Sequence, residues 1–481
     1  MKNLSFRLTP RSLLLAVLSL APLLLCTPAA VHAQWEPDVR LTNDGSSSWT
    51  TGNDAWCIAA SRDTVHVVWR DLRDGNYEFY YKRSPDGGAS WSADAALTND
   101  GSYSGEMSVA VSGTAVHVVW QDDRDGNLEI YYKRSTDGGT TWGPDVRLTN
   151  ALYESFFPSM AVLGGAVPVN TVHVVWDDRR DGNPEIYYKG SSDGGVSWGA
   201  DTRLTLDPNT SWYPSVAVSG TDVHVVWQDY RDGNMEIYTK HSSDGGMSWG
   251  SDTRLTYNPS DSQRPSVAVS DSNVHVVWRE SRDGNMEIYT KRSTDRGASW
   301  GADTRLTNNS SVSETPSVAF SGSNVHLVWW DERDGNAEIY YKRSWDNGVS
   351  WGADTRLTNA SGHSQRPSVA VSGTGVHVAW HDYRDGNDEI YYKRNPTGNG
   401  VEADVVPSSV STFPFSVHPN PFTSFSTVPG HSSESFSLYD ISGRRVGSYR
   451  GDRIGEGLEA GVYFVREESG KDKPVRVVKV R

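Results

Sequence analysis

The chain alternates short runs of β-branched and aromatic residues with polar turns that contain Asp and Gly. The segment Val223–Thr256, VHVVWQDYRDGNMEIYTKHSSDGGMSWGSDTRLT, contains most of this pattern once. Nearly unbroken apolar runs such as VHVVW, and PSVAVSG just before it, predict strands that are covered on both faces. The Asp-Gly pair within Arg231–Asn234 predicts a tight hairpin, because glycine readily adopts the positive φ that such a turn needs. EIYTK and DTRLT predict a third and a fourth strand.

This unit recurs along most of the chain. Its central tryptophan returns every 51 residues, with one interval of 56, at Trp69, Trp120, Trp176, Trp227, Trp278, Trp329 and Trp380. A fixed period of this length predicts a repeat architecture, and four short strands per unit are typical of a propeller blade. Seven copies of one unit disfavour the alternative, a β-sandwich with coincidental repeats. We therefore predict an all-β fold, a seven-bladed β-propeller.

The two ends of the repeat region are complementary. The seventh repeat carries Asn395–Asn399 in place of its last turn and lacks DTRLT, whereas Trp35–Asn43 matches the missing part. We therefore expect Asp38–Thr42 to pair with the strands of the seventh repeat, so that an N-terminal strand closes the propeller. Such closure covers two sheet edges that would otherwise promote aggregation.

The turn before the fourth strand has a recurring signature. Ser-x-Asp-x-Gly-x-x-Trp occurs at Ser84–Trp91, Ser135–Trp142, Ser191–Trp198, Ser242–Trp249, Ser293–Trp300 and Ser344–Trp351. This signature resembles the Asp-box, or bacterial neuraminidase repeat, of sialidase-like propellers, and the resemblance covers about Asp38–Arg394. The aspartate is expected to accept backbone N–H groups within the turn, and the tryptophan to pack between layers. The sialidases of this family have six blades and a Phe/Tyr-Arg-Ile-Pro motif that is absent here.

The first 33 residues are predicted to be a signal peptide. Lys2, Arg7 and Arg11 precede the apolar run Leu13–Leu25, and a small-residue cleavage site ends at Ala33. The apolar run is too short for an ordinary transmembrane helix, so we expect export and no transmembrane segment in the mature chain. Cys57 is then the remaining cysteine and is interpreted as a small core residue.

The net charge and the repeated polar residues exclude some classes of partner and assign structural roles to some residues. The formal net charge is −15 and no basic stripe is present, which argues against nucleic acid as a partner. The histidine of each VHVVW run is predicted to be structural, because equivalent positions point apart around a ring. The acidic residue two after each tryptophan either locks the hairpin through the Arg of Arg-Asp-Gly-Asn or belongs to a loose calcium loop. We expect no cofactor, with calcium as the open possibility, and assign no metal ligands.

Function is expected where the repeats differ. Two variable positions should surround the mouth of the central channel, one just before PSVAV and one just after the tryptophan. Aromatic faces beside arginines and carboxylates suit sugars or acidic ligands. From these positions and the adjoining loops we predict the ligand-binding residues Glu106, Tyr213, Arg264, Arg366, Arg70, Arg279, Trp212 and Trp330.

The resemblance to sialidases implies an arginine triad for the sugar carboxylate, a tyrosine nucleophile assisted by a glutamate, and an aspartate acid/base. Arg70, Arg264, Arg279 and Arg366 are the candidates for the triad, and Tyr213 with Glu106 for the nucleophilic pair. We assign no catalytic residue from the sequence.

The repeats stop after Arg394. Residues 34–394 form the predicted propeller, 395–412 a linker rich in Pro, Gly, Ser and Thr, and 413–481 a separate small β-sandwich. Within the last segment, Asn420–Phe422, Tyr439–Arg444 and Gly461–Phe464 resemble the signature positions of the C-terminal sorting domain of the type IX secretion system. This resemblance implies the type IX secretion machinery as a partner and a secreted or outer-surface location. An ordinary β accessory domain is the alternative.

Together these features predict a secreted or cell-surface propeller that binds extracellular glycans or glycoproteins. One alternative is an exo-glycosidase that hydrolyses terminal sialic acid. The other is a surface scaffold that binds protein partners.

Overall fold

The computed structural model describes residues 35–51, 57–163, 171–397, 424–425, 427, 435–440, 444–450, 452–467 and 475–479. The chain divides into two compact units, with the boundary between residues 402 and 403, inside the predicted linker. All regular elements in the described part of the chain are β-strands. The two units are described separately below.

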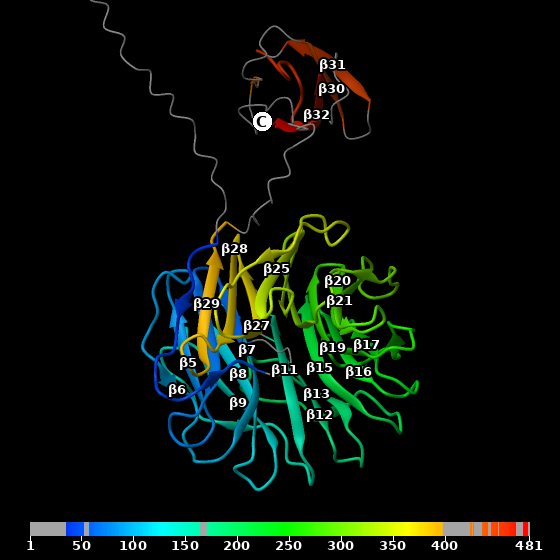
Figure 1. Cartoon of the computed structure of the whole chain (residues 1–481). Coiled ribbons are helices and arrows are strands. Elements are labelled where there is room, and N and C mark those ends of the chain that lie inside the picture. Colours follow the sequence, from blue (N-terminus) through cyan, green and yellow to red (C-terminus); the bar gives the residue numbers. More distant parts are fainter. Residues whose placement is uncertain are drawn as a thin grey trace, which may run out of the picture. The chain divides into compact units, whose positions relative to one another are not determined.

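The strands of the first unit fall into sheets that follow the repeats (Figure 1). Blade 1 holds β2 (Ser48–Trp49), β3 (Ile58–Ser61), β4 (Thr64–Asp71), β5 (Glu78–Ser84) and β6 (Ala95–Ala96). Blade 2 holds β7 (Ser104–Ser112), β8 (Ala115–Asp122), β9 (Glu129–Ser135) and β10 (Val146–Arg147). Blade 3 holds β11 (Ser155–Leu163), β12 (Thr171–Asp178), β13 (Glu185–Ser191) and β14 (Thr202–Arg203). Blade 4 holds β15 (Ser211–Ser219), β16 (Asp222–Asp229), β17 (Glu236–Ser242) and β18 (Thr253–Arg254).

The remaining blades repeat the same order. Blade 5 holds β19 (Ser262–Ser270), β20 (Asn273–Glu280), β21 (Glu287–Ser293) and β22 (Thr304–Arg305). Blade 6 holds β23 (Ser313–Ser321), β24 (Asn324–Asp331), β25 (Glu338–Ser344) and β26 (Thr355–Arg356). Blade 7 holds β27 (Ser364–Ser372), β28 (Gly375–Asp382), β29 (Glu389–Asn395) and β1 (Val39–Arg40). The described residues thus form the predicted seven-bladed antiparallel propeller.

Blade 7 is completed by the start of the described chain. Val39 pairs with Tyr392 and Arg40 with Tyr391, so β1 is the outer strand of the last sheet, beside β29 (Figure 1). Asp38 accepts a hydrogen bond from Arg384 at 2.8 Å. The Trp35 ring meets Tyr341 of blade 6 edge-on at 5.0 Å, as the tryptophans of the predicted Asp-boxes meet tyrosines in other blades. The predicted closure is therefore confirmed.

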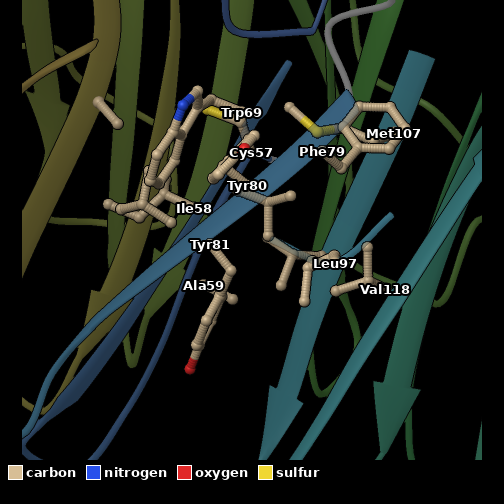
Figure 2. Packing of buried hydrophobic residues seen from close by; sticks show 14 of the residues in the cluster. Cys57, Ile58, Ala59, Trp69, Phe79, Tyr80, Tyr81, Leu97, Met107 and Val118 are labelled. Atoms are coloured by element: carbon tan, nitrogen blue, oxygen red, sulfur yellow. The ribbon is translucent and has the colours of Figure 1, made fainter. Parts of the chain in front are cut away.

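The core lies between neighbouring sheets. The seven repeat tryptophans are fully buried. Around Trp69, side chains of blade 1 pack against Met107 and Val118 of blade 2 and Tyr392 of blade 7 (Figure 2). Cys57 is buried in the same cluster, as predicted, and burial raises the pKa of its thiol to about 12. Each blade therefore buries its apolar faces only against the blades on either side.

A charged lock recurs at the β-hairpin of each blade. The Asp71 carboxylate accepts hydrogen bonds from Trp69 Nε1 at 2.9 Å and from the Arg73 guanidinium at 2.6 Å, and from Ser48 Oγ at 2.8 Å. Burial would raise the pKa of Asp71, but these hydrogen bonds outweigh burial and hold it below its ordinary value. The sequence predicts two roles for this acidic position, an Arg–carboxylate pair and a loose calcium loop. The contacts are those of the Arg–carboxylate pair.

The turn with the Ser-x-Asp-x-Gly-x-x-Trp signature is held by its aspartate. Asp86 Oδ1 accepts the backbone N–H of Ser90 at 2.8 Å, and Asp86 Oδ2 accepts the Ser90 hydroxyl at 2.6 Å. These hydrogen bonds lower the pKa of Asp86 to about 2. Trp91 packs edge-on against Tyr392 of blade 7, with ring centroids 4.8 Å apart. The turn therefore links one blade to the preceding one.

The repeated histidines are buried between strands. In blade 1, His66 Nδ1 lies 2.6 Å from the Tyr81 hydroxyl, and four further blades contain the same pair. Burial lowers the pKa of His66 to about 4, so the imidazole is neutral at physiological pH. The structural role predicted for these residues is consistent with these contacts.

The described part of the second unit is one antiparallel sheet. It contains β30 (Ser435–Tyr439), β31 (Arg445–Arg450), β32 (Gly461–Glu467) and β33 (Val475–Lys479), in the spatial order β31-β30-β32-β33. Its core consists of Phe436, Leu438, Ile454, Tyr463 and Val465. The predicted signature at Asn420–Phe422 lies outside the described residues.

The closure generates a stability prediction. Replacing Trp35 with Ala should lower the free energy of unfolding by about 3 kcal/mol, because a large buried ring is lost at the junction of blades 6 and 7. Trp345→Ala is the matched control, because that ring is 43% exposed and its loss should cost about 0.5 kcal/mol. Urea denaturation measures both; equal losses would contradict the role assigned to Trp35.

The buried histidines generate a pH prediction. Their folded pKa values lie near 4 or 3, below the ordinary 6.5, so the unfolded chain binds more protons in this window. The histidine contribution is complete above pH 6.5 and is lost as the pH falls, by about 1–2 kcal/mol per histidine at pH 5. The carboxylates with lowered pKa values lose their contribution only at lower pH. Urea denaturation from pH 7.5 to 5 should show falling stability; a flat profile would refute the prediction.

Candidate functional site

The variable positions before PSVAV lie on β-bulges at the start of the inner strands. The register of β11 against β12 shifts between Phe156 and Ser159, and β7, β15, β19, β23 and β27 contain corresponding shifts. The bulge residue has positive φ, near 50°, at Phe157, Tyr213, Arg264, Thr315 and Arg366. For a residue other than glycine, this conformation costs roughly 1 kcal/mol and is often found at functional sites. The corresponding Ala55 of blade 1 lies outside the described residues.

The channel below this mouth is apolar. A cavity of about 240 Å³ is lined by all seven inner strands, with Ala59, Val109, Ala161, Val218 and Phe320 among its walls. None of the predicted binding residues is among the described residues that line it. A polar ligand would therefore be held at the mouth rather than inside the channel.

The first cluster of mouth residues joins blades 7, 1 and 2. Thr50 Oγ1 donates to the Arg366 carbonyl at 3.0 Å and lies 2.9 Å from His381 Nδ1. Thr51 Oγ1 donates to Glu106 Oε2 at 2.7 Å. Two neighbouring threonines thus connect the bulge residues of the blades on either side of blade 1.

Arg70 lies in the same cluster, among aromatic rings. Its guanidinium lies 4.6 Å from the centroid of Tyr77 and 5.6 Å from that of Trp49, and it donates to the Tyr103 hydroxyl at 3.2 Å. Trp49 in turn donates to Asp388 Oδ2 at 2.8 Å. The aromatic rings leave one side of this arginine in a partly dry environment, which strengthens its attraction for an anion.

The cluster contains two arginines, Arg70 and Arg366, and two acidic residues, Glu106 and Asp388. Burial, followed by the positive charges of Arg366 and Arg70, lowers the pKa of His381 to about 3, so this imidazole is neutral. Arg73, in the hairpin lock of blade 1, is ion-paired to Asp71 at 2.6 Å. By contrast, among the described residues neither Arg70 nor Arg366 forms a direct ion pair with a carboxylate, although Arg366 is close enough to Asp388 to oppose the rise in its pKa that burial causes. The two guanidinium groups therefore keep N–H donors for a ligand, with Asp388 and Glu106 as negative charges nearby.

The second cluster joins blades 3, 4 and 5. The Phe157 and Tyr213 ring centroids are 4.4 Å apart, and the Arg264 guanidinium lies 4.8 Å from the Tyr213 centroid. Gln121 accepts the Phe157 N–H at 2.9 Å, and Gln228 accepts the Arg264 N–H at 3.0 Å. In blades 2 and 4, the position after the tryptophan therefore orients the bulge residue of the following blade.

Asp177 occupies that same position in blade 3. The side chain is 1% exposed, and Oδ1 has no hydrogen-bond partner in the described part of the chain. Burial raises the pKa of Asp177 well above its ordinary value, although Arg179 opposes the rise. A carboxyl group whose pKa is raised in this way is a possible proton donor. The sequence places an acid at this variable position, but its burial and missing partner are visible only in the structure.

The other predicted residues contact side chains or strands of the protein itself. Arg279 is ion-paired to Glu314 and donates to Gln263 at 2.8 Å. Trp212 pairs across the sheet with Gln228, and Trp330 with Glu314, so both lie on strands rather than on loops. The structure brings Tyr213 into contact with Arg264, and it links Glu106 to Arg366 through the two threonines. No direct contact joins Glu106 to Tyr213 among the described interactions, although Tyr213 and Glu106 both have further partners.

The described residues contain no group of three or more His, Cys, Asp or Glu side chains arranged to hold a metal ion. Within the same residues, no helix has the length and apolar character needed to span a membrane.

In the comparison with known proteins, this chain is similar to others in its fold. No family model matches the chain, and no curated protein matches it in sequence. Among solved structures, the polysaccharide lyase Uly1 has a TM-score of 0.51 at 9% identity, over 76% of this chain and 100% of that one. The endosialidase of phage phi92 has a TM-score of 0.47 at 12% identity, over 92% and 87%. The GH93 α-L-arabinofuranosidase of Fusarium graminearum has 0.42 at 16%, over 58% and 89%. The similarity to Uly1 supports the fold alone.

Proposed function

We propose that the propeller binds acidic glycans, free or on glycoproteins, at the mouth of its channel. The observation that carries this proposal is the pair Arg70 and Arg366 in an acidic chain, neither of which forms a direct ion pair among the described residues, although Asp388 lies near Arg366. A guanidinium presents paired N–H donors that match the two oxygens of a carboxylate. The neutral imidazole of His381 beside them adds no competing charge.

Aromatic rings at the same mouth supply the other half of sugar recognition. Trp49, Tyr77 and Tyr103 surround Arg70, and Phe157 and Tyr213 pack together across blades 3 and 4. The C–H faces of a pyranose pack on such rings, while its hydroxyl groups bind polar side chains. The strained bulges fix the backbone at Phe157 and Tyr213, which lowers the entropy cost of binding.

The proposal includes export of the protein to the outer surface or the medium. A signal peptide ending near Ala33 and a C-terminal unit similar to type IX sorting domains support a secreted or outer-surface protein. The type IX machinery would then recognise residues 413–481. Calcium is not needed for the binding proposed here.

The binding proposal predicts selectivity for charge. The full chain should bind 3′-sialyllactose more tightly than lactose, and the preference should weaken as ionic strength rises. Arg70→Gln and Arg366→Gln should each weaken binding of the sialylated sugar by about tenfold, since a charge-assisted hydrogen bond is lost. Calorimetry or ligand-observed NMR provides the measurement.

Arg62→Gln is the matched control. This arginine also has positive φ, 55°, but lies in the turn between β3 and β4, at the opposite end of blade 1, and its loss should leave affinity unchanged. Equal binding of lactose and 3′-sialyllactose, or full affinity in both mouth variants, would refute the proposal. Binding of a protein without its glycan would favour the scaffold alternative.

Asp177 favours hydrolysis of a terminal acidic sugar as a second candidate function. A buried carboxyl group with a raised pKa suits a general acid that protonates a leaving-group oxygen. If the chain releases sialic acid from a fluorogenic sialoside, Asp177→Asn should lower kcat by at least about 100-fold and leave glycan affinity within about twofold, because the amide keeps the shape but holds no transferable proton. Retained kcat in the variant, or no release by the unchanged chain, would eliminate this candidate and leave the binding proposal standing.

A further inference from the structure

The face opposite the mouth carries a second set of depressions, between neighbouring turns of the Ser-x-Asp-x-Gly-x-x-Trp signature. One of about 410 Å³ lies between blades 2 and 3, where Tyr132, Arg134, Trp142 and Gly195 are among the lining residues. An equivalent one of about 530 Å³ lies between blades 3 and 4, where Tyr188, Gly190, Trp198 and Gly246 take the same places. We call the latter the blade 3/4 groove. Equivalent grooves therefore occur at two junctions between blades, and the blade 3/4 groove is the larger of these two.

One side chain that differs between the two grooves is an arginine on the third strand. In four blades an arginine on the third strand donates to a backbone carbonyl in the turn of the next blade. These contacts are Arg83 to Gly138 at 3.0 Å, Arg134 to Gly194 at 2.8 Å, Arg292 to Asn347 at 3.3 Å and Arg394 to Gly87 at 2.6 Å. Blade 3 has Gly190 at this position, so no guanidinium crosses the groove.

The absence of the arginine leaves polar groups available in the groove. The Gly245 carbonyl, equivalent to Gly194, accepts only a long hydrogen bond of 3.4 Å from Tyr188 among the described contacts. Thr171 Oγ1, which also lines the groove, is buried without a hydrogen-bond partner among the described residues. A buried hydroxyl and a weakly bonded carbonyl both gain from a ligand that offers hydroxyl groups.

The lining chemistry indicates the class of ligand. Among the described residues that line the groove, none is charged; they include the hydroxyl groups of Ser192 and Thr202 and the half-buried ring of Trp198. An indole face with neighbouring hydroxyl and carbonyl groups suits a neutral sugar ring, and the volume is sufficient for one. The hairpin between β11 and β12 is longer than in the other blades, and its residues 164–170 lie outside the described part.

We propose that the blade 3/4 groove is a separate binding site for a neutral sugar unit, opened by Gly190. It lies on the face opposite Arg70 and Arg366 and uses no residue of the mouth. The protein therefore has two kinds of glycan contact, one for charge at the mouth and one for uncharged sugar at the opposite face. Attachment to a branched glycan through both kinds would gain strength by avidity.

Three variants of the full chain test this site, with methyl glycosides of glucose, galactose, mannose and N-acetylglucosamine as probes. The unchanged chain should bind at least one of them with a Kd on the order of 1 mM, as measured by saturation-transfer NMR. Gly190→Arg should weaken that binding by at least about tenfold, because the guanidinium is expected to reach the Gly245 carbonyl and fill the groove. Thr171→Val should weaken it by about threefold through loss of one hydroxyl group.

Arg134→Gly tests for a gain of sugar binding, a result that a misfolded variant would not give. Removing this arginine opens the groove between blades 2 and 3, so the number of neutral-sugar sites should rise from one to two. Gly190→Arg requires a shift of the Tyr188 hydroxyl, which an added Cβ would contact too closely, and thermal unfolding verifies that the variant folds. Binding of 3′-sialyllactose should be unchanged in all three variants.

Failure of this site is distinguishable from failure of the mouth proposal. No binding of any neutral glycoside by the unchanged chain, or unchanged affinity in folded Gly190→Arg, would overturn the groove. An unchanged number of sites in Arg134→Gly would overturn the role assigned to the missing arginine. In each case the charge preference measured at Arg70 and Arg366 would remain as it was.

Discussion

Pairing of β1 with β29 is the constraint on which the propeller depends. Each blade buries its apolar faces against its two neighbours, so a ring that opens where the chain ends meet would expose the faces of blades 7 and 1 together with a sheet edge. The segment that prevents this supplies several contacts at once. Trp35 packs on Tyr341, Asp38 accepts a hydrogen bond from Arg384, and Val39 and Arg40 pair with the last strand.

Within the closed ring, the repeated contacts hold the backbone of each blade in nearly the same conformation. A single substitution can therefore change the chemistry of a position without moving that position. The Trp–Asp–Arg lock, the His–Tyr pair and the turn aspartate hold nearly the same geometry from blade to blade. A bulge residue can therefore change from Phe157 to Tyr213 to Arg264 while its backbone stays near the same positive φ. The scaffold and the ligand-contacting side chains are in this way largely independent of each other.

Both proposed binding sites arise from departures from the repeat. At the mouth, Arg70 and Arg366 form no direct ion pair among the described residues, whereas the lock arginine Arg73 is paired to Asp71. On the opposite face, Gly190 stands where four blades have an arginine that bridges to the next turn. In a repeat protein, a missing bridge is easily recognised, because these four blades show the contact that the position would otherwise make.

The sequence alone determined the blade count, the closing strand, the buried tryptophans and the locations of the turns, because each is encoded by local periodicity that recurs at a fixed interval. It also placed Tyr213, Arg264 and Arg366 at equivalent positions of the mouth. Only the tertiary structure decided which of them meet, because contacts between blades join residues some fifty positions apart and depend on the bulges. The burial of Asp177, the two arginines near His381 and the groove at Gly190 follow from the same packing across blades, which no local pattern of residues encodes.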